Sequence, residues 1–113
     1  MQATVAVDFD GTLFESDHLG GVVPIKGAAE ALRLLRSRGV RIVIHTCRTG
    51  LAAAAGSLAE ELQWIEEQLR LAAMPFDEIF LGEKPVATVY VDDRAVAFDG
   101  DWSKSVAAVL ERL

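Results

Sequence analysis

Apolar and polar positions along the chain alternate between two periods. Short runs rich in β-branched residues predict four strands, at residues 4–7, 40–44, 78–81 and 88–91. The run at 40–44, VRIVI, is almost continuously apolar, which is typical of a strand buried on both faces. Segments with the helical spacing of apolar residues separate the strands. This alternation predicts an α/β fold with a mostly parallel sheet.

Three helices are predicted from apolar stripes and the residues that flank them. The first covers residues 27–39, with apolar residues on one face and arginines on the other. The second begins near Ser57, which has capping-box spacing with Glu60, and carries a stripe of leucine and isoleucine. The third covers residues 102–113 and is capped by Asp101. Between strands, such helices act as crossovers.

Three shorter segments complete the predicted order, β-α-β-α-β-β-α. Residues 51–57, LAAAAGS, are expected to be a flexible entry to the second helix, and residues 96–98 to form a short fifth strand. Phe98 and Trp102 are expected to anchor the last helix to the sheet. A chain of 113 residues has room for one compact domain of ordinary size, so we expect a single domain at 1–113.

Composition and charge narrow the classes of function. Apolar residues make up 51% of the chain and charged residues 25%, which is a globular composition. The net charge of -6 disfavours nucleic acid as a partner. The one cysteine, Cys47, allows no intrachain disulfide, and no apolar run approaches the roughly 20 residues of a membrane helix. With no signal-peptide pattern at the start, we expect a soluble, cytoplasmic protein.

Polar residues directly follow each predicted strand. In open α/β sheets, ligands bind beyond the carboxyl ends of the strands, so these residues are expected to share one crevice. In chain order they are Asp8 and Asp10; His45, Thr46, Cys47 and Arg48; Lys84; and Asp92, Asp93 and Arg94.

Several carboxylates in one crevice repel each other, and burying them without compensation is very unfavourable. A cation is therefore expected among them, and oxygen-only ligands with open positions suit Mg²⁺. With a metal ion and Lys84 present, the crevice would attract a phosphate group. Asp8 is then the expected nucleophile toward phosphorus.

Four motifs in this order resemble those of the haloacid dehalogenase (HAD) superfamily of phosphohydrolases. They are VAVDFDGTLF, IVIHTC, GEKP and VYVDDRA, spread from Val5 to Ala95. The resemblance covers nearly the whole chain. It implies a HAD-like, Rossmann-like three-layer α/β/α sandwich.

The resemblance also implies a role for each motif residue. Asp8 would attack the phosphoryl group to give an aspartyl-phosphate, and Asp10 would serve as general acid and then general base. Thr46 would donate a hydrogen bond to a phosphate oxygen, and Lys84 would balance the negative charge. The implied activity is that of a Mg²⁺-dependent phosphomonoesterase whose substrate the sequence does not specify.

The implied metal ligands come from both ends of the chain. Mg²⁺ would be held by Asp8, by the backbone carbonyl of Asp10 and by Asp92, with Asp93 nearby. Related phosphatases of small metabolites usually have a cap domain, and the segment at 14–27 is long enough only for a flap. The site is thus expected to be open, unless a neighbouring subunit of a homo-oligomer covers it.

Several alternatives stay open at this stage. Arg48 and Arg94 would either bind substrate or form structural ion pairs, and His18 and Lys26 in the flap could reach a leaving group. Trp64 is expected in packing or in an oligomer contact, and Cys47 as a small filler.

Two other functions are compatible with the motifs. One is a HAD-fold regulatory protein that binds phosphate or a partner with little turnover, and the other is a polynucleotide-end phosphatase. Two-component receiver domains are excluded by motif order, because their acidic pair precedes the lysine, whereas Asp92 and Asp93 follow Lys84. A cysteine phosphatase is disfavoured, because HTCRTG lacks the spacing between thiolate and arginine.

Overall fold

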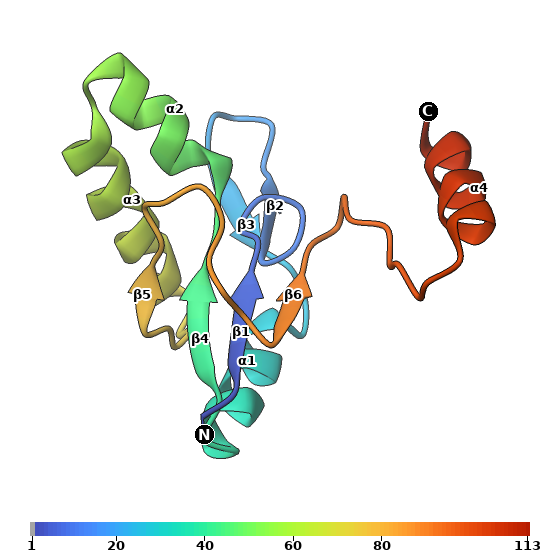
Figure 1. The fold of residues 1–113 in the computed structure, drawn as a ribbon. Helices are drawn as coiled ribbons and strands as arrows, with labels where there is room; N and C mark the ends of the chain where they lie inside the picture. Colours follow the sequence, from blue (N-terminus) through green and yellow to red (C-terminus); the bar gives the residue numbers. More distant parts are fainter. Residues whose placement is uncertain (1) are drawn as a thin grey trace.

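A computed structural model describes residues 2–113 (Figure 1). The chain forms six strands and four helices within these residues. In chain order they are β1 (Thr4–Val7), β2 (Phe14–Ser16), β3 (Val22–Pro24), α1 (Ala28–Ser37), β4 (Arg41–Ile44), α2 (Cys47–Ala55), α3 (Leu58–Leu71), β5 (Glu78–Ile79), β6 (Val89–Val91) and α4 (Trp102–Arg112). The predicted α/β class is confirmed.

The main sheet has four parallel strands in the order β5-β4-β1-β6. Val5 of β1 pairs with Ile42 of β4 on one side and with Val89 of β6 on the other. The chain therefore moves from β1 outward to β4 and β5, then returns to the opposite side of β1. This reversal puts the topological switch point, where α/β folds bind ligands, at the carboxyl end of β1.

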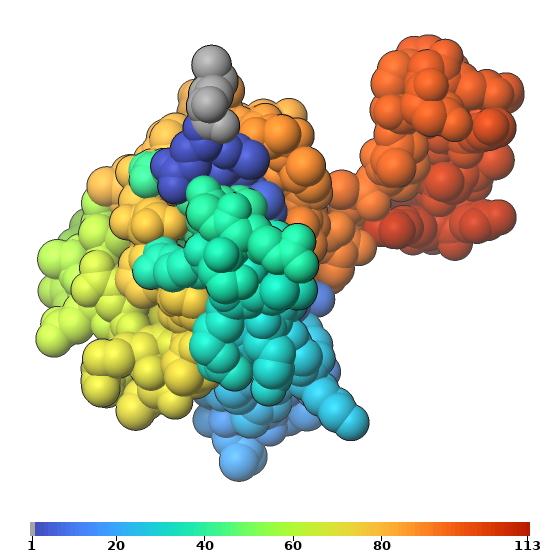
Figure 2. Space-filling model, turned by 90° about the horizontal axis from the view of Figure 1, so that it is seen from below, coloured from blue at the N-terminus to red at the C-terminus, as the bar shows by residue number. Residues whose placement is uncertain are grey.

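Helices α1 and α3 cover the same face of this sheet (Figure 2). Val5 and Val7, with their neighbours Ile42 and Ile44, form a buried cluster that includes Leu32 of α1 and Ile65 and Leu69 of α3. Two successive right-handed crossovers in one direction must place their helices on one face. The apolar stripes predicted for both helices are confirmed.

The opposite face of the sheet carries no helix among the described residues. Ala6 and Val43 on this face are buried, and the connection from β5 to β6 passes across it (Figure 1). Within residues 2–113 the fold is therefore a two-layer arrangement compatible with a Rossmann-like fold, and the expected third layer is not formed. The reason is that α4, which would have to supply it, lies apart from the sheet.

Helix α4 projects from the body of the protein (Figures 1 and 2). The radius of gyration is 15.1 Å, compared with about 13 Å for a compact chain of this length. Asp101 caps α4 as predicted, since its carboxylate accepts hydrogen bonds from the backbone N–H groups of Ser103 and Lys104. Phe98 and Trp102 contact each other, with ring centroids 5.1 Å apart, and both are largely exposed. The expectation that they anchor α4 to the sheet is wrong.

Two other local predictions are wrong. Residues 51–55 belong to α2, a helix that runs from the N-cap Thr46 to Gly56, which has the left-handed conformation typical of a helix end. Residues 96–98 form no strand, because the segment leaves the sheet after β6. Ser57 does precede α3, but its side chain makes no cap, and its hydroxyl instead donates to the carbonyl of Ala52.

The flap expected at residues 14–27 contains an antiparallel hairpin of β2 and β3. The turn between these strands is fixed by Asp17, whose side chain accepts hydrogen bonds from the N–H groups of Leu19 and Gly21. The hairpin pairs three residues of β2 with three of β3. Over residues 2–113, no helix combines the length and apolar character that crossing a membrane requires.

Candidate active site

Directly after β1, Asp8 lies at the site and Phe9 lies in the core. Phe9 is fully buried and stacks on Phe14, with ring centroids 4.6 Å apart. Asp8 continues the sheet, because its N–H donates to the carbonyl of Val91 in β6. The Phe9 carbonyl accepts from the N–H groups of Leu13 and Phe14, which closes a tight turn. Burial of Phe9 thus fixes the position from which Asp8 projects.

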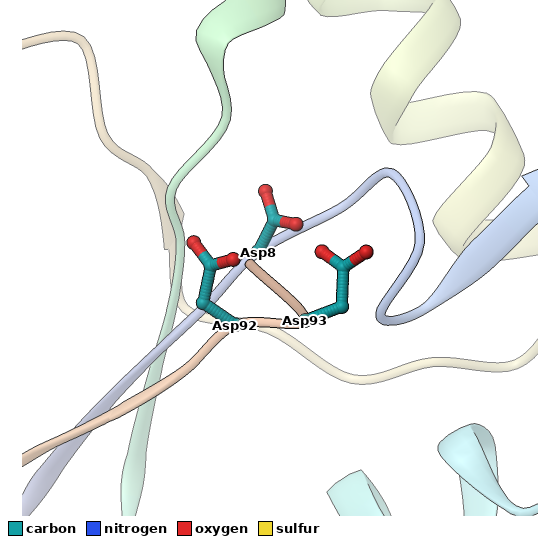
Figure 3. Close-up of side chains that lie close together, drawn as sticks. All are labelled: Asp8, Asp92 and Asp93. Carbon is teal, nitrogen blue, oxygen red and sulfur yellow. The ribbon is translucent and has the colours of Figure 1, made fainter. Parts of the chain in front are cut away.

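Asp8 meets the two acidic residues that follow β6. Oxygen atoms of Asp8, Asp92 and Asp93 all lie within 4.8 Å of one another. Figure 3 shows Asp8 on one chain segment, and Asp92 and Asp93 on another, with all three carboxyl groups pointing to the same side. We call these three residues the acid cluster. They are three of the four metal ligands expected from the sequence.

Thr12 holds two members of the acid cluster together. Its hydroxyl lies 3.2 Å from Asp8 Oδ2 and 3.4 Å from Asp93 Oδ1, and it accepts a hydrogen bond from the Asp93 backbone N–H at 3.1 Å. Thr12 was not among the site residues expected from the sequence. Its position two residues after Asp10, in the motif DFDGT, was the available signal for this contact.

Gly11 allows this close approach. Its φ is +83°, a left-handed conformation, and a Cβ at this position would collide with the Asp93 carboxylate. Glycine is therefore required here both by the turn and by the packing of the acid cluster.

The surroundings of Asp8 raise its pKa to about 6. The main cause is burial, followed by the negative charge of Asp92 and a side-chain hydrogen bond with Asp93. A divalent cation between the carboxylates would remove this cost, and three carboxylates with room for water fit Mg²⁺. The donor set of the cluster therefore fits the metal that the sequence predicted.

Asp10 lies outside the acid cluster and forms an ion pair with Arg48. Arg48 Nε and Nη2 donate to the two carboxylate oxygens of Asp10 at 2.7 and 2.8 Å, and Nη1 donates to Glu61 at 3.3 Å. The guanidinium group also lies over the ring of Trp64, 4.7 Å from its centroid. Both charge pairing and stacking hold Arg48 in place, in keeping with the alternative of a structural ion pair.

Thr46 and Lys84 contact other groups. Thr46 is buried, and its hydroxyl accepts from the Arg48 backbone N–H as the N-cap of α2. Lys84 Nζ lies 4.9 Å from the centroid of the Tyr90 ring. Within residues 2–113, no salt bridge joins Lys84 to an acid. Thr46 comes shortly after β4, as the sequence predicted, whereas Lys84 lies in the connection from β5 to β6 and contacts Tyr90 of β6.

A cavity of about 410 Å³ opens beside the acid cluster. Its lining residues are Asp8, Asp10, His45, Cys47, Asp92 and Arg94. Arg94 thus lies where it could meet a substrate, whereas His18 and Lys26 are exposed in and beside the flap and do not line the cavity.

Two further residues that line the cavity are Cys47 and His45. Cys47 is exposed at the start of α2, so its assignment as a small filler is wrong. The His45 ring is oriented by a 3.0 Å hydrogen-bond contact between Nε2 and the carbonyl of Glu83. Trp64 was expected either in packing or in an oligomer contact. Its ring packs on Phe9 and Arg48.

Comparisons with known proteins give one structural likeness. No family model and no curated protein matches the chain. A solved structure of a conserved protein from Bacteroides thetaiotaomicron is similar to it, with 26% identity and a TM-score of 0.61. The match covers 100% of this chain and 93% of the other. The likeness supports an α/β fold of this kind and leaves the chemistry to be argued from the residues.

Proposed function

We propose that this protein is a Mg²⁺-dependent phosphomonoester hydrolase of the HAD type, with Asp8 as its nucleophile. The observation that carries the proposal is the acid cluster. Asp8, Asp92 and Asp93 come from opposite ends of the chain and converge at the switch point of the sheet. The order of the four motifs supports membership of the HAD superfamily, and the lone cysteine and acidic charge support a cytoplasmic location.

Asp8, Asp92 and Asp93 would hold the magnesium ion, together with the Asp10 carbonyl. When bound, the metal ion neutralises negative charge at the carboxylates and on the transferring phosphoryl group. Arg94, at the edge of the same cavity, adds a positive charge for the phosphate. Lys84 and Thr46 would contact the phosphate group once substrate is bound. Hydrogen bonds at catalytic sites often shorten only in the enzyme–substrate complex.

The proposed reaction has two steps. An Asp8 carboxylate oxygen attacks phosphorus, the bond from phosphorus to the leaving oxygen breaks, and Asp10 gives its proton to that oxygen. Asp10 then takes a proton from water, which attacks the aspartyl-phosphate and releases inorganic phosphate and free Asp8. To carry that proton, Asp10 must release one of its two hydrogen bonds from Arg48, and the other bond then orients it at the cavity.

The test is release of phosphate from an aryl phosphate, with and without Mg²⁺. Wild type is expected to turn over only with the metal, and Asp8→Asn to lose activity. Asp99→Asn is the matched control, because Asp99 is an exposed acid paired with Lys104 outside the cavity.

Equal rates for wild type and Asp8→Asn across a broad panel would sink the catalytic proposal. The panel should include sugar phosphates, nucleotides, phosphorylated oligonucleotide ends and phosphopeptides. Binding of phosphate without turnover would then favour a regulatory protein, and activity confined to oligonucleotide ends would identify a polynucleotide-end phosphatase.

A further inference from the structure

Helix α4 presents its apolar side to solvent. Five apolar residues follow the helical spacing i, i+4, i+7, i+8 and i+11, and each is at least 40% exposed. These residues, the α4 stripe, are Trp102, Val106, Val109, Leu110 and Leu113. In globular proteins such a stripe faces a core. On α4 the stripe stays largely exposed, and its one ring contact among the described residues joins Trp102 to Phe98.

On the side of α4 that faces its own chain, the residues in contact are polar. Ser105 is the residue of α4 that is buried, and its hydroxyl has no hydrogen-bond partner. Arg112 donates to the backbone carbonyl of Asp93 at 2.9 Å. The Arg112 bond thus ties α4 to the segment after β6, while the stripe is left exposed.

A groove beside β6 also lacks cover. Strand β6 is an edge of the sheet, and all three of its residues are exposed. The groove has a volume of about 700 Å³ and is lined mainly by apolar side chains, including Val89, Tyr90, Val96 and Phe98. An exposed edge strand with apolar neighbours is a surface that proteins normally protect.

We propose that α4 of a second copy of this chain fills this groove, in a reciprocal exchange that gives a twofold dimer. Each copy has one exposed stripe and one unfilled groove. In a pair, the stripe of each copy can therefore cover the groove of the other. Exchange of an identical element is a low-cost route to a closed dimer. Pairing stripe with stripe would leave both grooves open, and within one chain α4 lies apart from the sheet, tied by Arg112 to the backbone of Asp93 (Figure 1).

The size of the two surfaces favours exchange. An 11-residue helix is about 16 Å long. A stable interface buries about 800 Å² per partner, which one such helix does not provide alone. Reciprocal exchange joins two helices and two grooves in one interface.

The dimer would also change the surroundings of the acid cluster. Asp92 lines both the groove beside β6 and the cavity that holds Asp8. The helix of the second copy would therefore lie next to this open cavity and narrow it. The proposal stands on the exposed surfaces and does not depend on the proposed hydrolase activity.

Sedimentation equilibrium of the full chain tests the exchange. Wild type is expected to be a dimer, and Val109→Asp in the stripe to raise the dimer dissociation constant at least about tenfold. Ala107→Asp is the matched control, since it adds the same charge at an exposed position of α4 outside the stripe. Val89→Asp changes the groove and should weaken the dimer as Val109→Asp does. Circular dichroism and thermal melts check that each variant folds.

Mixing the two weakened variants separates exchange from other dimers. Val109→Asp retains an intact groove and Val89→Asp an intact stripe, so a 1:1 mixture can form one wild-type interface per heterodimer. The average mass of the mixture should exceed that of either variant alone. A monomeric wild type, a dimer insensitive to Val109→Asp, or a mixture no heavier than its components would each overturn the proposal.

Discussion

Arg48 is the residue that links the candidate site to the core. Its guanidinium group bonds Asp10 through two nitrogen atoms and stacks on Trp64, whose ring in turn contacts Phe9. Phe9 lies between the two acids of the first motif. The position of Asp10 is thus determined by packing beneath the sheet edge as well as by its own backbone.

Replacement of Arg48 by lysine should distinguish the effect of its positive charge from that of its two hydrogen bonds to Asp10. Lysine keeps the positive charge but cannot bond both oxygens of Asp10 in a plane or stack in the same way. We expect the phosphatase rate of Arg48→Lys to fall about 10- to 100-fold, because small misplacement of a catalytic group has effects of that size.

Steady-state kinetics on an aryl phosphate measure this effect. Arg33→Lys is the control, because Arg33 forms only an exposed ion pair with Glu30 and a bond to the Ala73 carbonyl. An unchanged rate in Arg48→Lys would show that the ion pair does not orient Asp10.

Gly11→Ala should disturb the acid cluster through a steric contact. The new Cβ would meet the Asp93 carboxylate, so we expect Mg²⁺ affinity to fall about tenfold, the usual effect of misplacing a metal ligand. Gly20→Ala is a matched control, because Gly20 has a similar positive φ but no atom within 4 Å of the added Cβ. Isothermal titration with Mg²⁺ should distinguish them. Both variants should lose about 1 kcal/mol of stability to the left-handed conformation.

The raised pKa of Asp8 predicts how the metal-free protein responds to pH. The carboxyl group has a pKa of about 6 when folded and 3.8 in its ordinary state, so the folded chain holds the proton more tightly. The resulting stabilisation is complete below about pH 4 and is lost as the pH rises through about 6.

Urea unfolding in a chelator measures this loss. The stability of wild type relative to Asp8→Asn should decline between pH 4 and pH 7. A constant difference across this range would show that the acid cluster does not perturb Asp8.

At the residue scale, the acids were more predictable than their partners. Asp8, Asp92 and Asp93 follow strands, and parallel strands end at one edge, so their convergence follows from topology alone. The pairing of Asp10 with Arg48 depends on side-chain direction at the start of α2, which periodicity does not encode. The contact of Lys84 with Tyr90 depends in the same way on the path of an irregular connection.

Among the elements, α2 bears most directly on the site. It begins at the residues that follow β4, and Thr46 serves as its N-cap. The same threonine is the proposed donor to phosphate. A hydroxyl can accept from a backbone N–H and donate its proton elsewhere, so the two roles are compatible.

Two substitutions at Thr46 test the cap. Thr46→Val keeps the shape but removes the hydroxyl, and should lower the free energy of unfolding by about 1 kcal/mol. Thr46→Ser retains the cap and should cost less. Chemical denaturation measures both, and equal losses would mean that the methyl group, rather than the cap, stabilises this end of α2.

Element prediction failed where the apolar pattern is weak. Helix α2 has the sequence CRTGLAAAA, in which Gly50 and a run of alanines give no clear stripe, although alanine is the strongest helix former. The four strands of the main sheet and the helices α1 and α3 were predicted from their apolar patterns, whereas β2 and β3 of the flap were not. Strand ends differed by one or two residues, as with β5 at Glu78–Ile79, since pairing rather than propensity ends a short strand.

At the scale of the whole molecule, the sequence predicted the sheet but not the number of layers. The stripe of α4 shows that the helix is amphipathic, and the pattern cannot tell which surface will cover it. Tertiary contacts decide this, and the bond from Arg112 to the Asp93 carbonyl is one of them.

Magnesium should stabilise the whole fold, because its proposed ligands join β1 to β6. At a metal concentration 100 times the dissociation constant, the gain is about 2.7 kcal/mol. Thermal unfolding should therefore shift upward with Mg²⁺ in wild type and in Asp99→Asn, and much less in Asp93→Asn. A shift of equal size in all three would place the metal elsewhere.

The pairing of β1 with β6 also bears on the order of folding. Thr4 and Thr88 bond each other across 84 residues, so this pairing closes the longest loop of the sheet and carries the largest entropic cost. Contacts of such long range form slowly. Asp92 and Asp93 can reach Asp8 only after this last strand docks, so a partly folded chain lacks the acid cluster. Metal binding would then appear only when folding is complete, and a partly folded chain would have no hydrolase activity.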